Sequence, residues 1–251
     1  MDLNLKNKVI VVTGGAKGIG RAIVEVLLGE GALPFVIGRN EVDNLKVGAA
    51  SFTAELTEPN QCKLAIAAVI KEYGRIEGLV NNAGENDGIN LEHGSYEAFM
   101  LSLHKNLVHY YLIAQHALPH LIKSKGPIVN ISSKTAETGQ GGTSAYAASN
   151  GGRNALTREW AVELLKHKIR VNAVVVSESW TPMYEQWIST LESPEEKLKE
   201  IVSKIPLENR MTKPEEIANM VAFLLSEKSS HTTGQIIHVD GGYVHLDRAL
   251  K

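Results

Sequence analysis

The chain has 251 residues, of which 43% are hydrophobic and 22% are charged, and its formal net charge is -2. This length suits one α/β domain with a sizeable core, and the balanced charge gives no support for a nucleic-acid or membrane surface. The single cysteine, Cys62, excludes an intramolecular disulfide, and no apolar run approaches the roughly 20 residues of a membrane helix. The N-terminal segment lacks the features of a signal peptide. We therefore expect a cytoplasmic protein that acts on a small molecule, with no nucleic-acid or membrane partner.

Short β-branched runs alternate with longer helical patterns, which is typical of βα units that build a parallel sheet covered on both faces. The predicted strands span 9–13, 34–37, 51–54, 78–80, 127–131, 169–175 and 234–239. The predicted helices span 18–29, 59–73, 96–124, 145–167, 194–205 and 214–226. Together they predict a single Rossmann-fold α/β domain over 1–251 with a doubly wound, seven-stranded parallel sheet. The most irregular region, 177–210, is a candidate substrate lid.

The turn TGGAKGIG at 13–20 lies between the first predicted strand and the first predicted helix. Glycines there let the backbone turn tightly and approach a pyrophosphate, whose charge is met by amide groups at the helix N-terminus. An ordinary strand-to-helix turn is the alternative for the glycines alone, but the strand before and the helix after favour a dinucleotide site. The predicted cofactor-binding residues of this turn are Gly14, Lys17, Gly18, Ile19 and Gly20.

Further motifs follow this turn in a fixed order along nearly the whole chain. NNAG at 81–84 ends the fourth predicted strand, NISS at 130–133 ends the fifth, and Tyr146 follows Ser133 by thirteen residues. With the Gly-x-x-x-Gly-x-Gly turn, this set resembles the classical short-chain dehydrogenase/reductase family. The resemblance implies hydride transfer with a nicotinamide cofactor. It also implies a homotetramer, in which the two longest predicted helices bury a face against their counterparts.

The end of the second predicted strand bears on the choice of cofactor. An acid here accepts the ribose 2′-hydroxyl of NAD, whereas an arginine nearby accommodates the 2′-phosphate of NADP. Gly38 stands at the acid position and Arg39 follows it, while Lys17 offers a second cation. By resemblance we predict NADP, with NAD as the alternative, although both cations also fit a solvated surface. The resemblance adds cofactor contacts at Glu55, Leu56, Asn82, Ala83, Gly84, Tyr146, Asn150 and Val176.

The predicted catalytic residues are Asn106, Ser133, Tyr146 and Asn150. Moving a hydride between a carbinol carbon and nicotinamide requires a base for the alcohol proton and donors for the developing oxyanion. By resemblance, Tyr146 is the acid/base and Ser133 its hydrogen-bonding partner at the substrate oxygen. Asn106 resembles the proton-relay residue of the family, which holds a water through the helix backbone.

Asn150 departs from the family, which has a lysine four residues after the tyrosine. That lysine binds the nicotinamide ribose and lowers the tyrosine pKa through its charge. Asn150 lies on the same helical face as Tyr146 and has donors for ribose hydroxyls, but it has no charge. Arg153 and Lys134 are the nearest cations in sequence; either supplies the missing field or simply faces water or a subunit contact. The alternative to an enzyme is a catalytically silent cofactor-binding protein, which retention of the other catalytic residues disfavours.

Polar loops surround the predicted substrate mouth. An acid beside an aromatic platform, as at Glu178 and Trp180, suits a polyhydroxylated ring, although ordinary polar loops and a core tryptophan are the alternative. Further predicted substrate contacts are Glu85, Asn86 and Gln140, and no metal site is predicted. The stretches at 132–146, 155–164 and 229–250 resemble the L-fucose dehydrogenase group of the family. This group oxidises aldoses to lactones at the anomeric carbon, so an aldose such as L-fucose is the predicted substrate; another alcohol or ketone is the alternative.

Overall fold

The computed structural model describes residues 2–39 and 48–247, and its centre is one sheet of parallel strands. The strands are β1 (Val9–Thr13), β2 (Leu33–Gly38), β3 (Ala50–Thr53), β4 (Gly78–Asn81), β5 (Ile128–Ser133), β6 (Val171–Val176) and β7 (Ile236–Val239). They lie in the order β3-β2-β1-β4-β5-β6-β7, and every neighbouring pair is parallel. The predicted seven-stranded, doubly wound sheet is confirmed. Residues 248–250 of the C-terminal stretch that carries the resemblance lie outside the described residues.

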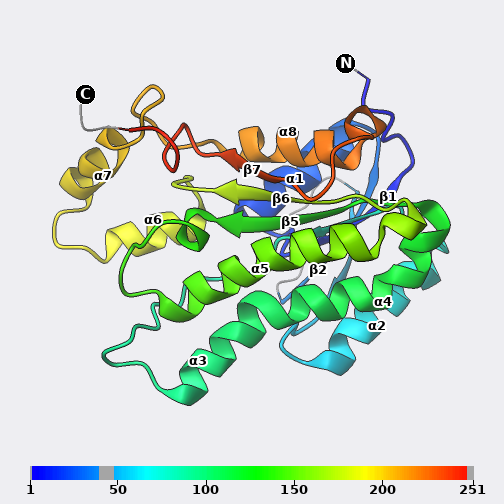
Figure 1. Ribbon diagram of the computed structural model, residues 1–251, viewed down its shortest axis with the longest axis horizontal. Helices are drawn as coiled ribbons and strands as arrows, with labels where there is room; N and C mark the ends of the chain where they lie inside the picture. Colours follow the sequence, from blue (N-terminus) through cyan, green and yellow to red (C-terminus); the bar gives the residue numbers. More distant parts are fainter. Residues whose placement is uncertain (1, 40–47, 248–251) are drawn as a thin grey trace.

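Helices cover both faces of the sheet (Figure 1). The helices are α1 (Gly18–Gly29), α2 (Pro59–Tyr73), α3 (Tyr96–Leu103), α4 (His109–Ser124), α5 (Ser144–Glu163), α6 (Pro182–Ser189), α7 (Pro194–Ser203) and α8 (Pro214–Leu225). One hydrophobic core lies between the sheet and α1 with α8, and the other between the sheet and α2, α4 and α5. Burial of both strand faces explains why the central strands read as continuous apolar runs.

The helix predicted over 96–124 is helical along its whole length, but its hydrogen-bonding pattern changes in the middle. Between α3 and α4 the chain makes one π-helical turn, His104–Val108, and the catalytic candidate Asn106 lies in it. Such a turn departs from the regular α-helical hydrogen-bonding pattern and is frequent at functional sites. In this protein the Asn106 carbonyl accepts a hydrogen bond from the Arg153 side chain of α5. The predicted helical span is therefore confirmed, and the π turn is the feature that the sequence pattern did not indicate.

The region 177–210 is more regular than the sequence predicted. Besides α7 it contains α6, which starts where Thr181 accepts a hydrogen bond from the Tyr184 amide and Pro182 occupies the first turn. Its far end is fixed because Ile205 is buried and the Leu207 amide donates to the Gly241 carbonyl at 3.0 Å. Helices α6 and α7 lie beyond the carboxyl ends of β5 and β6 (Figure 1). That this region forms a substrate lid, and that the chain is one domain, stay predictions.

Cys62 on α2 has no exposed surface, and its thiol donates to the Leu56 carbonyl at 3.4 Å. Burial raises the pKa of this thiol to about 11. Because the thiolate is the reactive form, Cys62 is chemically inert in the folded protein.

Two glycines of α1 give a matched test of the phosphate-binding turn. A Cβ on Gly20 would lie 2.2 Å from the Gly14 carbonyl oxygen and 2.5 Å from Asn82 Nδ2, whereas nothing lies within 4 Å of one on Gly29. We expect Gly20→Ala to lower the free energy of unfolding by about 1–3 kcal/mol and to abolish cofactor binding. We expect Gly29→Ala to raise it by up to about 1 kcal/mol. Urea unfolding of both variants checks this, and equal effects would contradict the close packing of the turn.

Candidate active site

The glycine turn after β1 is held in place by the NNAG segment after β4. The Thr13 hydroxyl accepts hydrogen bonds from the amides of Asn82 and Ala83, at 2.9 and 3.1 Å. The Asn82 side chain donates to the carbonyls of Thr13 and Gly14, at 2.9 and 3.2 Å. Gly14 has a φ of +68° and passes so close to Ala83 that a Cβ would lie 2.9 Å from the Ala83 Cα. Two predicted cofactor segments therefore form one rigid unit at the switch between β1 and β4, the usual position of a ligand crevice.

The N-terminus of α1 is open toward an anion. Lys17 precedes the helix in an extended conformation, no side chain caps the first turn, and that turn contains no acidic residue. Its free amide groups therefore suit a pyrophosphate, which fits a dinucleotide in this crevice. A Cβ on Gly18 would lie 3.4 Å from the Thr181 side chain, so the start of the 177–210 region reaches this turn. Thr181 was not among the predicted site residues.

Arg39, the predicted 2′-phosphate ligand, is paired with a residue predicted to touch substrate. Its guanidinium lies 2.9 Å from one carboxylate oxygen of Glu85, and Lys105 lies 2.6 Å from the other. Hydrogen bonding to Lys105, with a smaller contribution from Arg39, holds the pKa of Glu85 below its usual range. Glu85 thus links the cofactor side of the site to the turn between α3 and α4. A Cβ on Gly38 would lie 3.7 Å from the backbone of Gly14, so the end of β2 passes close to the glycine turn.

The segment after β3 contains the predicted cofactor contacts Glu55 and Leu56. The Glu55 carboxylate accepts hydrogen bonds from the amide and the hydroxyl of Thr57, at 3.1 and 3.0 Å, while Leu56 is buried in the core. The side chain of Leu56 therefore serves packing, and any contact with a ligand at this position comes from the backbone.

The predicted catalytic residues come together from three elements. Ser133 ends β5 opposite Val176 of β6, and its hydroxyl accepts from the Thr135 amide at 3.3 Å. The turn that follows Ser133 packs against α5, which carries the half-buried Tyr146 in its first turn. Asn106 has no exposed surface, and its side-chain oxygen accepts from the Glu85 amide at 2.8 Å. The arrangement places a phenol and a hydroxyl at the carboxyl edge of the sheet.

A guanidinium lies beneath these residues. Arg153 of α5 is only 3% exposed, and it donates to the carbonyl of Asn106 at 2.6 Å and to that of Ile131 at 3.2 Å. Its guanidinium carbon also lies 4.3 Å from the ring centroid of Tyr110. No carboxylate among residues 2–39 and 48–247 forms an ion pair with it. The positive charge is therefore met by carbonyl dipoles and an aromatic face. The alternative that Arg153 faces water was wrong.

Asn150 is turned toward this guanidinium. Its side-chain oxygen accepts from Arg153 at 2.9 Å, and its amide nitrogen donates to the Tyr146 carbonyl at 2.9 Å. The residue has no exposed surface. Both ends of the amide predicted to bind the cofactor ribose are thus engaged inside the protein.

Space for Arg153 depends on the last residue of NNAG. A Cβ on Gly84 would lie 2.7 Å from a terminal nitrogen of Arg153 and 2.8 Å from the Asn106 side-chain oxygen. His109 adds no second charge, because burial lowers its pKa to about 3, with the Arg153 charge acting in the same direction. Burial also raises the pKa of Tyr110 above its usual range, while Arg153 opposes that rise and Tyr146 adds to it. Arg153, Tyr110 and Tyr146 therefore share one electrostatic neighbourhood.

The predicted substrate acids are both paired. Glu178 forms an ion pair with Lys134, whose ammonium also lies 4.2 Å from the ring centroid of Tyr243. Lys134 is buried, so the alternative that it faces water was wrong. Burial and the nearby Glu178 carboxylate raise the pKa of Tyr184, a residue that the sequence analysis did not assign.

Trp180 is 40% exposed, and its ring centroid lies 6.1 Å from that of Tyr184, which contacts Trp187 at 5.2 Å. The alternative of a core tryptophan was wrong. Gln140 lies on a loop that lines a shallow pocket, and Asn86 is exposed, with its side-chain oxygen accepting from the Gly88 amide at 3.3 Å. A cluster of three aromatic side chains thus stands at the surface beside Glu178.

Comparisons with known proteins agree with this geometry. The family model described as enoyl-(acyl carrier protein) reductase matches residues 14–244. The 3-oxoacyl-[acyl-carrier-protein] reductase FabG of Thermotoga maritima is 36% identical, covering 96% of this chain and 100% of that protein. The L-fucose dehydrogenase of Mus musculus is 33% identical, covering 94% and 88%. The chain belongs to the short-chain dehydrogenase/reductase family.

Solved structures extend the same result. The Cj0485 dehydrogenase superposes with a TM-score of 0.96 at 43% identity, covering 100% of this chain and 99% of that one. The aldohexose dehydrogenase of Thermoplasma acidophilum superposes with a TM-score of 0.93 at 33% identity, covering 98% of both chains. The predicted family is thus confirmed, with L-fucose dehydrogenases among its relatives, and the chain is an oxidoreductase by family. Within the described residues, no helix has the length and apolarity required to cross a membrane.

Proposed function

We propose that this oxidoreductase transfers a hydride between a nicotinamide cofactor and the anomeric carbon of an aldose such as L-fucose, giving a lactone. The observation that carries the proposal is the aromatic cluster beside the Glu178 carboxylate, in which the half-buried Tyr184 lies between the exposed Trp180 and Trp187. Aromatic rings cover the apolar face of a sugar, while carboxylates accept hydrogen bonds from its hydroxyls. Relatives whose names include L-fucose dehydrogenase, L-xylulose reductase and aldohexose dehydrogenase support a sugar.

In this proposal the residues of the chain hold and move one proton. The Tyr146 phenolate accepts the proton of the anomeric hydroxyl, while Ser133 donates a hydrogen bond to the same oxygen as it becomes a carbonyl. A nicotinamide cofactor bound in the crevice would supply the acceptor for the hydride of the anomeric carbon. Asn106 and the π-helical turn then connect Tyr146 to a path for proton exchange.

Arg153 is the proposed replacement for the lysine that the family has at the position of Asn150. It is a buried cation without a carboxylate partner in the described part of the chain, and it shares the surroundings of Tyr146. A nearby positive charge favours the phenolate form of a tyrosine. Asn150 then acts as a positioning residue, because its side-chain oxygen fixes the guanidinium. This assignment disfavours the silent cofactor-binding protein, whose support rests on Asn150.

NADP is the proposed cofactor, with NAD as the alternative. The exposed cations Lys17 and Arg39 lie at the pyrophosphate turn and at the end of β2, where the adenosine ribose of a dinucleotide is read. Glu85 competes with a 2′-phosphate for Arg39. Preference for NADP therefore depends on how far the phosphate displaces this carboxylate.

A homotetramer and a cytoplasmic location remain part of the proposal. The exposed apolar side chains Tyr111 of α4 and Val162 of α5 support an interface, since they are 48% and 68% exposed. Large apolar residues on such helices gain stability when a second copy covers them.

A cofactor-reduction assay tests the function. We expect turnover of L-fucose, L-galactose or D-arabinose, and none of methyl α-L-fucoside, because its anomeric oxygen has no proton to give up. Tyr146→Phe should lower the rate by about 10²- to 10⁴-fold. Turnover of unrelated alcohols alone would support the alternative alcohol or ketone substrate. Tight cofactor binding without turnover of any substrate would support the silent protein.

Titration with NADP and with NAD tests whether Lys17 and Arg39 select the phosphorylated cofactor. We expect tighter binding of NADP than of NAD by the parent protein, and reversal in Arg39→Asp, because a carboxylate there repels the 2′-phosphate. Glu85→Gln should strengthen NADP binding while leaving NAD binding nearly unchanged, since it removes the competing charge. Equal or tighter binding of NAD by the parent protein would reject the assignment.

The pH dependence of the rate tests Arg153. In Arg153→Gln we expect the rising alkaline limb to move to higher pH and the rate at neutral pH to fall, because the phenolate loses a nearby cation. Asn150→Lys alone should gain nothing, since it brings a second cation against the guanidinium. The double variant should regain part of the lost rate.

Unfolding midpoints of these variants separate lost charge from lost structure. An unchanged limb in Arg153→Gln, together with a faster Asn150→Lys at neutral pH, would show instead that Asn150 is an uncompensated replacement. That outcome leaves the proposed sugar oxidation intact.

A further inference from the structure

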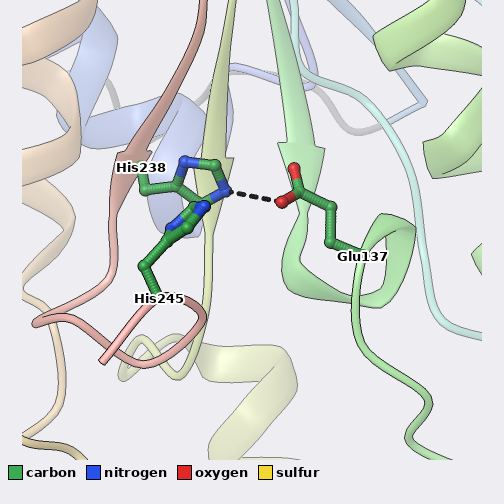
Figure 2. A group of neighbouring side chains, drawn as sticks. All are labelled: Glu137, His238 and His245. Carbon is green, nitrogen blue, oxygen red and sulfur yellow. Dashed lines mark ion pairs between the residues drawn. The ribbon is translucent and has the colours of Figure 1, made fainter. Parts of the chain in front are cut away.

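Three side chains that bind metals well meet outside the active site (Figure 2). They are Glu137, which follows the turn after β5, His238 of β7 and His245 of the C-terminal segment. One ligand atom of each lies within 4.8 Å of those of the other two. Glu137 Oε2 is 3.1 Å from His238 Nε2, and the two imidazole centroids are 4.3 Å apart at 88°. We propose that this cluster, the His-His-Glu cluster, is a binding site for a divalent metal of the zinc class.

The backbone fixes each of the three residues before any metal arrives. His238 is held in the ladder with β6, where it pairs with Val175. His245 returns toward it because the buried Asp240 carboxylate accepts the amides of Gly242 and Val244, at 2.8 and 3.0 Å, and bends the chain. This turn brings the imidazoles of His238 and His245 next to each other.

The carboxylate has its own support. The Glu137 amide donates to the Lys134 carbonyl at 2.9 Å, which closes the turn after β5. The buried Asn154 of α5 donates to Glu137 Oε1 at 3.4 Å and leaves Oε2 toward the histidines. Hydrogen bonds of this kind from a neighbouring side chain are typical of carboxylates that bind metals.

The ion pair alone does not satisfy the histidine. Among residues 2–39 and 48–247, His238 Nε2 finds no hydrogen bond of acceptable geometry, although it is inaccessible to solvent and the Glu137 carboxylate is only 3.1 Å away. Two ligands at 2.0–2.1 Å from a tetrahedral zinc lie roughly 3.3 Å apart, which is close to this separation. A metal ion placed between His238 Nε2 and Glu137 Oε2 would accept a lone pair from each atom. A shared proton would need a straight hydrogen bond, which these two side chains do not form.

The donor set selects the kind of ion. Two neutral imidazoles and one carboxylate suit zinc and its neighbours in the first transition row, whereas magnesium and calcium prefer oxygen ligands. Glu137 and His245 are exposed, so an ion reaches the cluster from solvent and water completes its coordination. Arg158 lines the same pocket but is exposed, and water screens its charge.

An anion is the competing ligand, because two histidines and Arg158 line one pocket. The Glu137 carboxylate faces the His238 nitrogen and would repel an anion at that point (Figure 2). The geometry therefore favours a cation.

A bound metal would connect segments on the substrate side. Glu137 follows the turn that carries Lys134, and the C-terminal turn between the two histidines carries Tyr243, over which Lys134 lies. The same turn anchors the end of the 177–210 region through Gly241 and Leu207. The metal thus stabilises the surroundings of the mouth without touching the reacting atoms, and the inference does not depend on the proposed substrate.

Calorimetry with zinc chloride tests the site on the full chain, after removal of any purification tag and treatment with a chelator. We expect one zinc per chain with micromolar or tighter affinity, and a rise in the melting temperature. Glu137→Gln and His245→Ala should each weaken binding by at least about 10-fold, because each removes a ligand. His231→Ala, an exposed histidine placed before β7, is the matched control and should bind as the parent does.

Cobalt gives a spectroscopic check. Co²⁺ bound to the parent protein should show the visible absorption of a four- or five-coordinate ion, and both ligand variants should lose it while their metal-free melting temperatures stay near that of the parent. No zinc binding by the parent, affinity unchanged in both ligand variants, or stabilisation by phosphate in place of zinc would each overturn the proposal. One zinc per two chains would mean that two copies share the metal, and would overturn a site formed within one chain.

Discussion

The buried guanidinium of Arg153 is the constraint around which the site is arranged. It joins three elements, because it donates to the π-helical turn at Asn106, to β5 at Ile131 and to its own helix at Asn150. A charge buried at this depth is costly unless carbonyl dipoles surround it, so the π turn and the bare Gly84 are conditions for its presence. The geometry of the π-helical turn and the proposed electrostatic field around the Tyr146 phenol therefore depend on the same guanidinium.

The two acids predicted to contact substrate are paired with cations before a ligand enters. Glu85 lies between Arg39 and Lys105, and Glu178 lies against Lys134. Such pairs keep long side chains in place, yet a ligand that binds there must replace interactions that already exist. Selectivity then depends on whether a phosphate or a hydroxylated ring replaces them well, and less on the number of polar residues near the mouth.

Local patterns predicted the parts of the structure that depend on nearby residues. The alternation of buried strands and helices gave the sheet, and the glycine spacing at 13–20 gave the phosphate-binding turn. Helix α6 was missed although Thr181 and Pro182 form a readable start signal. Asn150 and Arg153 are three residues apart on one helical face, so their contact was within reach, but its burial under Asn106 depends on a π turn that the sequence pattern does not reveal. Ion pairs between distant loops require the tertiary structure.

Because the Cys62 thiol is unreactive, the protein is suited to site-specific labelling through an introduced cysteine. The Cys62 thiol is buried in the core and its pKa is raised, so it stays protonated and unreactive. A cysteine introduced at an exposed position would therefore be the sole reactive thiol of the described chain. A fluorophore attached in place of Leu207, which is 59% exposed, would sit beside the anchor of the 177–210 region. Its emission would follow movements of that region in real time, with the native cysteine left untouched and silent.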